Sequence, residues 1–318
     1  MSAEPATRVI MAGAQASEDA ARVLAAGGLV AFPTETVYGL GADATNGQAI
    51  ARLYAAKGRP QFNPLIAHVL DLAAANRLAA FNATAQRLAE KFWPGPLTLV
   101  LPKAADCPVA DLATAGLDTI ALRVPAHSVA RELLGKFGKP IVAPSANRSG
   151  HVSPTTTAHV LADLRGRIDL IVDGGATPVG LESTIVSCAG APTLLRPGAL
   201  PRETIEAALE VSLADAAPRD KPEAPGMLAS HYAPRATLRL NASGAQAGEI
   251  LLGFGAAPDA ALNLSQRGDL VEAAANLFSH LRALDAKGAK VIAVMRIPHE
   301  GLGEAINDRL DRAAAPRS

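Results

Sequence analysis

Helical and strand patterns alternate between residues 17 and 210, and this alternation constrains the fold more than any other feature of the sequence. Short apolar runs predict buried strands, whereas apolar residues spaced three and four apart predict amphipathic helices. Strands are expected at 28–32, 65–69, 97–101, 119–124, 141–143, 168–172, 183–187 and 193–196. Helices are expected at 17–26, 48–56, 84–92, 128–137, 156–164 and 201–210. Ser17 is expected to cap the first helix. The pattern is typical of an α/β layered domain on a mixed sheet.

The chain has 318 residues, which is long for one core, and its composition changes after residue 211. Segment 213–225 is rich in Ala, Pro and charge without periodicity, as linkers are. Beyond it, strands are expected at 236–240, 249–254 and 290–295, and helices at 269–284 and 304–313. This order predicts a small Rossmann-like α/β domain. We expect domains at 1–211 and 236–318, joined by a linker at 212–235.

Charge and cysteine content exclude several classes of protein. Lys and Arg number 30 and Asp and Glu number 30, and this zero balance argues against stable binding to nucleic acid. The two cysteines have no metal-binding spacing, and the chain shows no His/Cys cluster, so no metal site is expected. No signal peptide is visible, and the longest apolar run, 23–33, is too short to cross a bilayer. We expect a cytoplasmic protein with no membrane association.

A compact group of hydroxyls and one carboxylate follows the first predicted strand, in Pro33-Thr-Glu-Thr-Val-Tyr-Gly-Leu-Gly41. Lys57 and Arg59 come later, in Lys57-Gly-Arg-Pro60, and Asn63-Pro64 follows. Arg presents a two-pronged donor to phosphate and Lys a point charge, and no Walker A motif offers another phosphate site. The alternative is a solvated pair of cations at a helix end. The prolines indicate a shaped loop and favour phosphate binding.

Two further polar groups sit at strand ends. Ser145 and Asn147 follow a strand and could contact phosphate or an adenine amino group, or form a turn. Ser153 lies nearby, in a segment that could equally cap a helix. Glu182-Ser-Thr184 and Arg196-Pro-Gly198 lie on a predicted hairpin, where the alternative is cross-strand pairing on an exposed face.

Arg123 and His68 occupy predicted strands. Arg123 lies in the apolar run Thr119-Ile-Ala-Leu-Arg-Val124, where an unpaired charge is costly. A ligand carboxylate or an internal Glu is therefore expected opposite it. A lone His in a strand, such as His68, is more often a structural residue.

Taken together, these motifs resemble the threonylcarbamoyl-AMP synthase family. The matching segments are Pro33–Gly41, Lys57–Pro60, Asn63–Leu65, Trp93–Pro96, Leu122–Pro125, Pro144–Asn147, Glu182–Thr184, Leu195–Gly198 and Pro225-Gly-Met227 with His231-Tyr-Ala-Pro234. The resemblance covers nearly the whole chain. It implies a YrdC-like twisted mixed sheet with flanking helices, followed by the smaller Rossmann-like domain of the two-domain form.

The resemblance also implies a reaction in which L-threonine, bicarbonate and ATP give threonylcarbamoyl-AMP and pyrophosphate. The product would pass to the machinery that modifies the tRNA adenosine beside the anticodon, and Mg²⁺ would accompany ATP. The threonine positions carried over are Thr36, His68, Arg123, Ala143 and Ser183. The ATP positions carried over are Arg59, Asn63, Thr119, Ser145, Asn147, Ser153, Arg196 and Tyr232. We expect Lys57 and Arg59 to act in catalysis by holding phosphate. The segment around Tyr232 is expected to close over the nucleotide as a lid, with Met227 or Leu228 filling an apolar spot; an ordered connector is the alternative.

Two other functions are alternatives to the synthase reaction that the resemblance implies. An RNA-binding YrdC-like module would need a basic surface with stacking aromatics, whereas only 3% of this chain is aromatic. A carbamoyltransferase acting on another protein would require an attached acylphosphatase or zinc-finger segment, and the sequence contains neither.

Overall fold

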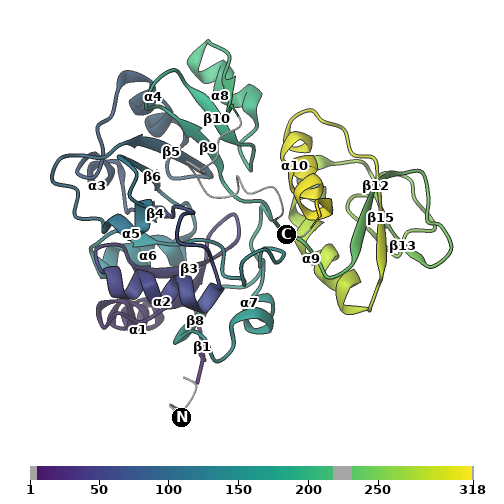
Figure 1. Cartoon of the computed structure of the whole chain (residues 1–318), viewed down its shortest axis with the longest axis horizontal. Coiled ribbons are helices and arrows are strands. Elements are labelled where there is room, and N and C mark those ends of the chain that lie inside the picture. Colours follow the sequence, from purple (N-terminus) through teal and green to yellow (C-terminus); the bar gives the residue numbers. More distant parts are fainter. Residues whose placement is uncertain (1–5, 218–230, 317–318) are drawn as a thin grey trace.

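Two separate sheets organise the chain in this computed structural model, which describes residues 6–217 and 231–316 (Figure 1). The larger sheet has 11 strands in the order β1-β8-β2-β3-β7-β4-β6-β5-β9-β10-β11. Its strands are Arg8–Met11 (β1), Val30–Pro33 (β2), Tyr38–Asp43 (β3), Ile66–His68 (β4), Leu97–Pro102 (β5), Thr119–Arg123 (β6), Ile141–Val142 (β7), Leu170–Asp173 (β8), Thr184–Ser187 (β9), Thr193–Arg196 (β10) and Ala214–Asp215 (β11). Neighbours pair in both directions, so the predicted mixed sheet is confirmed.

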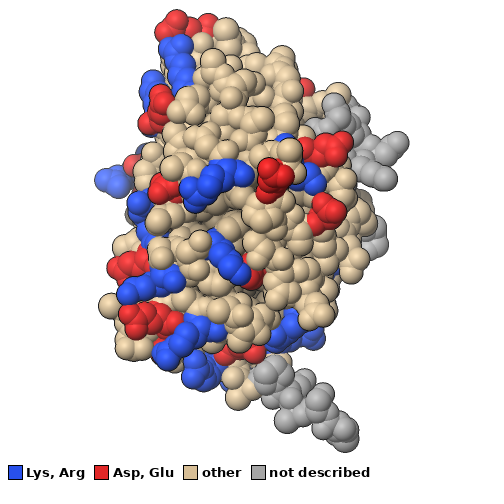
Figure 2. Space-filling model, turned by 90° about the vertical axis from the view of Figure 1, so that its left-hand side faces the viewer, with Lys and Arg blue, Asp and Glu red and all other residues tan. Residues whose placement is uncertain are grey.

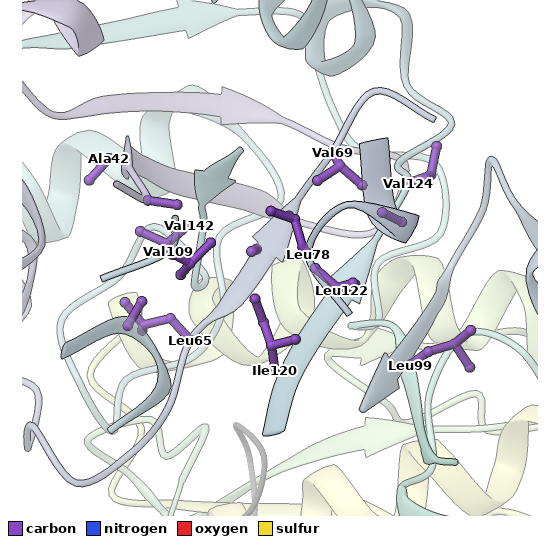
Figure 3. Close-up of a cluster of buried hydrophobic side chains, with 14 of the residues drawn as sticks. Ala42, Leu65, Val69, Leu78, Leu99, Val109, Ile120, Leu122, Val124 and Val142 are labelled. Atoms are coloured by element: carbon purple, nitrogen blue, oxygen red, sulfur yellow. The ribbon is translucent and has the colours of Figure 1, made fainter. Parts of the chain in front are cut away.

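Helices cover both faces of this sheet. They are Ala14–Ala25 (α1), Gly47–Lys57 (α2), Leu72–Asn76 (α3), Ala83–Phe92 (α4), Asp111–Thr114 (α5), Ser128–Phe137 (α6), Thr157–Leu164 (α7) and Arg202–Leu209 (α8). α1 and α6 pack on one face, where Leu24, Leu133 and Leu170 are buried together. α2, α4, α7 and α8 contribute to the larger core on the other face (Figure 3). The sheet is thus held rigidly between two apolar layers.

The second sheet is entirely parallel, with the order β12-β15-β13-β14. Its elements are Thr237–Ala242 (β12), Glu249–Gly253 (β13), Leu262–Asn263 (β14), Leu270–Ala286 (α9), Val291–Met295 (β15) and Leu302–Ala314 (α10). Both helices lie on the face turned towards the first domain (Figure 1). Val37, Val152 and Leu181 of the first domain join the core of the second. The two domains therefore share one continuous apolar interface.

Several elements differ from the sequence predictions. The prediction of Ser17 as a cap is wrong, because α1 begins at Ala14 and Ser17 lies inside it, bonded to Glu132. β3 was not expected, since Gly39 and Gly41 weaken a strand pattern. Both glycines are required there by close packing: a Cβ on Gly41 would lie 2.8 Å from the Phe32 ring, and one on Gly39 would lie 3.1 Å from the Ala143 Cβ.

The first residues of the predicted linker pack against the first domain. Leu213 is buried in the first core, and β11 pairs in parallel with β10. This pairing supports placing the domain boundary after Asp215 rather than after residue 211, a placement that we offer as a proposal. Met227 and Leu228, the predicted apolar plug, lie outside the described residues, as does most of the linker. Within the described part of the chain, none of the helices has the length and apolar character needed to cross a membrane.

Candidate active site

A small cavity of about 40 Å³ lies where the first domain meets the start of the second. Its walls come from the β2–β3 turn, the ends of β4, β6 and β7, the β9–β10 hairpin and the segment that enters the second domain. The lining residues are Thr36, Val37, Arg59, Ile66, His68, Arg123, Ala143, Pro144, Ser145, Glu182, Ser183, Arg196, His231 and Tyr232. Segments far apart in sequence thus converge on one polar pocket.

The β2–β3 turn presents the hydroxyls expected at the end of the first predicted strand. Thr34 holds the turn, because its hydroxyl donates to the Val37 carbonyl at 2.7 Å. The Thr34 and Thr36 hydroxyl oxygens are 2.8 Å apart, and Thr36 is fully buried. Because β2 and β3 are both buried strands of the same sheet, the turn between them has a fixed position.

Arg123 ends β6 and forms a buried ion pair with Glu35 of this turn. Its Nη2 donates to Glu35 Oε1 at 2.7 Å, and its Nε donates to the Gly95 carbonyl at 3.3 Å. Burial alone would raise the pKa of Glu35, but the charge and hydrogen bond of Arg123 hold that pKa below its ordinary value. The expectation of an internal Glu opposite Arg123 is confirmed. Among the described residues, the side-chain hydrogen bonds of Arg123 are made by Nε and Nη2, and none is made by Nη1.

His68 lies beside Arg123, because β4 and β6 pair in parallel with these two residues in register. Burial and the adjacent Arg123 charge lower the pKa of His68 to about 3, so the imidazole is neutral. Its Nδ1 is buried without a partner among the described residues. A neutral ring nitrogen of this kind can accept or donate a hydrogen bond to a small polar ligand.

Two further arginines, Arg59 and Arg196, line the cavity. Arg59 follows α2, is 8% exposed, and donates to the Asn63 and Pro64 carbonyls. Burial lowers its pKa to about 10, which leaves it charged at neutral pH. Arg196 ends β10 and donates to the Ser183 carbonyl at 2.7 Å. Burial also lowers the pKa of His231 far below its ordinary value, with further lowering by the charges of Arg59 and Lys57. The positive charges of Arg59 and Arg196 therefore suit an anion.

Lys57 is buried like Arg59 but does not line the cavity. Its ammonium group donates to the carbonyls of Ser145 and Asn147, which holds the loop after β7 against the end of α2. Burial and the charge of Arg59 lower the pKa of Lys57 well below its ordinary value. The alternative of two solvated cations is wrong for both residues, since Lys57 is 2% exposed.

Comparison with known proteins identifies the family of the protein that contains this cavity. A Sua5/YciO/YrdC family model, described as telomere recombination, matches residues 22–198, and the model of the threonylcarbamoyl-AMP synthase C-terminal domain matches residues 200–315. The threonylcarbamoyl-AMP synthase of Bacillus subtilis is 42% identical over 94% of this chain and 92% of its own. The chain belongs to the threonylcarbamoyl-AMP synthase family.

Solved structures agree with this assignment. The crystal structure of P. abyssi Sua5 complexed with L-threonine aligns with a TM-score of 0.90 and 39% identity, covering 97% of this chain and 98% of that one. The E. coli YciO structure aligns with a TM-score of 0.54 at 21% identity, covering 60% of this chain and 96% of that one. The YciO likeness shows the fold of the first domain alone.

The cavity brings together most of the positions carried over from the synthase family. All five threonine positions line it, together with Arg59, Ser145, Arg196 and Tyr232 of the ATP set. Asn63 and Asn147 are buried just outside its lining, and both carry side-chain atoms that have no partner among the described residues. Buried polar atoms are ordinarily hydrogen-bonded. The side-chain atoms of Asn63 and Asn147 that lack a partner therefore indicate that a ligand binds here.

Thr119 and Ser153 are not in the lining. Thr119 lies in a second hollow of about 280 Å³ with Ser187 and Thr193. The two hollows lie on the same sheet face and are joined by an apolar patch of Ile66, Val100, Ala121, Ile185 and Leu195, since Ile66 lines the cavity and Val100 and Leu195 line the second hollow. Ser153 is fully buried, and its hydroxyl donates to Glu182. Thr156, not Ser153, caps α7.

Sequence reasoning missed two residues of the site in this synthase family member. Glu182 was noted in the predicted hairpin and in the family motif Glu182–Thr184 but was not assigned to the site, yet it lines the cavity. Arg309 of α10 was not noted, although it is fully buried and bonds Glu182. Its signal in the sequence is its position on the apolar stripe of that helix, with Ile306 and Ala313. A cation on a buried stripe requires a partner.

The residues around the cavity do not form a metal cage. The described chain contains no group of three or more His, Cys, Asp or Glu side chains placed to hold a metal ion. Glu35 and Glu182, which bond cavity residues, already pair with Arg123 and Arg309. Mg²⁺ commonly keeps several waters and binds through substrate phosphates. The donor set therefore fits Mg²⁺ only as a companion of ATP.

Proposed function

We propose that this chain condenses L-threonine, bicarbonate and ATP into threonylcarbamoyl-AMP and pyrophosphate. One observation carries this proposal: a neutral His68 and a paired Arg123 line the same buried cavity as Arg59 and Arg196. An amino-acid carboxylate suits His68 and Arg123, and phosphate suits the other two arginines. The family membership of the chain supports the same reaction.

The threonine carboxylate is assigned to Arg123, whose Nη1 makes no hydrogen bond to the described residues. Thr36, Ser183 and the backbone at Ala143 would surround the rest of the amino acid, with His68 as a neutral hydrogen-bonding partner. Holding the amine at a fixed position favours its attack on carbon dioxide, which gives a carbamate and releases a proton, or on bicarbonate, which gives a carbamate and releases water.

The phosphates of ATP are assigned to Arg59, Ser145 and Arg196, with Lys57 and Asn147 holding the loop that carries Ser145. A carbamate oxygen attacks the α-phosphorus, the bond to the β-phosphate oxygen breaks, and pyrophosphate leaves. Positioning and charge stabilisation supply most of the catalysis in such transfers. Adenosine would extend along the apolar patch towards Thr119, and Asn63, Ser153 and Tyr232 would complete the nucleotide site.

RNA binding is less well supported as a function. On the face of the first domain shown in Figure 2, Lys and Arg side chains are interspersed with Asp and Glu. This face offers no continuous basic track for a nucleic acid backbone.

We propose that the adenylate passes to the tRNA-modifying machinery in the cytoplasm. The free thiols of Cys107 and Cys188 fit that reducing compartment.

The test is pyrophosphate release by the purified chain with Mg²⁺-ATP, with threonine or bicarbonate omitted in turn. Release that requires both supports the proposal, and mass spectrometry of the quenched reaction should detect the adenylate. Release that is independent of threonine, or the absence of the adenylate, would contradict it. Serine in place of threonine measures how well the pocket distinguishes the methyl group.

A further inference from the structure

Arg309 of α10 is a fully buried arginine of the second domain that bonds residues of the first. Its Nε donates to Glu182 Oε2 at 2.8 Å, and its Nη2 donates to the Pro197 carbonyl at 3.0 Å. Nη1 donates to the adjacent Asp308. A guanidinium group that is fully buried is stable only because each of its three nitrogens donates a hydrogen bond.

The first contact leads directly to the cavity. Glu182 lines the cavity, and its second oxygen, Oε1, accepts a hydrogen bond from the hydroxyl of Ser153. Arg309 therefore sets the orientation of a carboxylate that in turn orients Ser153. The Pro197 carbonyl follows Arg196 in the chain, so the second contact fixes the loop that carries an arginine of the cavity wall.

A third contact is with Tyr232. The Arg309 guanidinium carbon lies 5.0 Å from the centre of the Tyr232 ring, which also stacks on Phe278 at 5.8 Å. Tyr232 lines the cavity and has a φ of 62°, a left-handed conformation that a non-glycine residue keeps only when its surroundings enforce it. Arg309 and Phe278, both from the second domain, provide that enforcement.

We propose that Arg309 is a positioning residue for the nucleotide, through which docking of the second domain sets the affinity for ATP. The inference rests on the proposed function, because it uses the assignment of Ser153, Arg196 and Tyr232 to ATP. Arg309 has no bond to Thr36, His68 or Arg123 in the described structure. Ser183, the threonine position next to Glu182, is bonded by Arg196, so a loss of Arg309 is expected to weaken ATP binding more than threonine binding, whereas a general loosening of the fold weakens both equally.

The experiment compares Arg309→Met and Arg309→Lys with Glu304→Gln in the full chain. Glu304 lies on the same helix and also joins the domains, through Arg202 of α8, but it is partly exposed and outside the cavity lining. Calorimetry measures the Kd of a non-hydrolysable ATP analogue and the Kd of threonine, and thermal melting checks the fold. Steady-state assays give KM for ATP and kcat.

Arg309→Met is expected to raise the Kd and KM for nucleotide at least about tenfold while changing the Kd of threonine less than about threefold, since the buried partner Glu182 loses its counter-charge. Arg309→Lys keeps the charge, but its single ammonium group cannot replace the bonds to Glu182, Pro197 and Asp308 together. An intermediate rise in the Kd and KM for nucleotide is therefore expected. Glu304→Gln should lower the melting temperature without changing nucleotide affinity.

Nucleotide affinity equal to wild type in a folded Arg309→Met chain overturns the inference, as does an equal weakening of threonine and nucleotide. Should the Met variant fail to fold, the Lys variant decides by the same two affinities. A wild-type chain that binds nucleotide but forms no adenylate would contradict the proposed function. The effect of Arg309 on nucleotide affinity could still be determined in that case, because binding is measured directly.

Discussion

Arg123 carries its charge into a buried position, and Glu35 is its carboxylate partner there. We expect Arg123→Met to weaken threonine binding at least about tenfold and nucleotide binding much less, because a charge-assisted bond to the substrate carboxylate is lost. Calorimetry with each ligand separately measures both effects. Unchanged threonine affinity in the folded variant would be incompatible with the assignment.

This substitution also leaves Glu35 buried without a counter-charge, which costs on the order of 3–5 kcal/mol of unfolding free energy. The double variant Arg123→Met, Glu35→Gln is the matched control. It should recover much of the stability, measured by urea unfolding, without recovering threonine affinity. Separating the two losses in this way distinguishes ligand binding from fold stability at the same pair.

His68 should make the stability of the protein depend on pH. Its pKa is lowered from 6.5 to about 3 in the folded state, so the unfolded chain binds the extra proton between these values. Stability is therefore lost as the pH falls through this window, and His68 alone should account for ~2–3 kcal/mol between about pH 6.5 and 4.5. Urea unfolding at several pH values measures the slope. His68→Gln should give a shallower slope; parallel curves would refute the prediction.

At the scale of elements, the β9–β10 hairpin depends on the close approach of Gly198 to the start of β9. A Cβ at Gly198 would lie 2.4 Å from the Thr184 nitrogen and 2.5 Å from the Glu182 carbonyl oxygen, both of them backbone atoms. Gly198→Ala must therefore push the Arg196 loop away from Ser183. We expect a loss of ~1–3 kcal/mol in stability and at least about tenfold in pyrophosphate release.

Gly190 provides the matched control on the same hairpin, since a Cβ there meets no atom within 4 Å. Gly190→Ala should change stability by less than about 0.5 kcal/mol and leave pyrophosphate release unchanged. Equal effects of the two substitutions would show that the close contact at Gly198 is not what orders the site.

Most helices and strands were predictable because each has a local pattern of its own. Gly138 ends α6 in the left-handed conformation, as a glycine after a helical pattern predicts. β3 was not predictable, because its glycines are chosen for contact with Phe32 and Ala143 rather than for strand propensity. β11 is only two residues long and is ordered by its partner β10, which no local pattern could indicate.

At the scale of the whole molecule, the first domain has its own cores, whereas the cavity is completed by His231 and Tyr232 of the segment that enters the second domain. We expect a chain truncated after Ala217 to remain folded, because β11 and both apolar layers are retained. It should bind nucleotide at least about tenfold more weakly and release pyrophosphate correspondingly slowly, since Tyr232 and Arg309 are missing. Circular dichroism, calorimetry and the pyrophosphate assay measure these three properties.

The truncated chain also exposes Val37, Val152 and Leu181, which are buried against the second domain. Some loss of solubility is therefore expected and should be checked by gel filtration. A truncated chain that makes and retains the adenylate as well as the full chain does would refute both the lid hypothesis for the segment around Tyr232 and a role of the second domain at the site.

The sequence by itself determined the layered α/β class, most element positions, the need for a partner at Arg123, and the motifs that indicate a phosphate-bearing substrate. These features depend on local patterns and on the cost of burying charge, both of which can be read along the chain. Only the tertiary structure decided that Glu35 is that partner, that Lys57 holds a loop rather than lining the cavity, and that Arg309 reaches Glu182. Glu182 and Arg309 are 127 positions apart, and packing between two domains, which no local pattern encodes, brings them together.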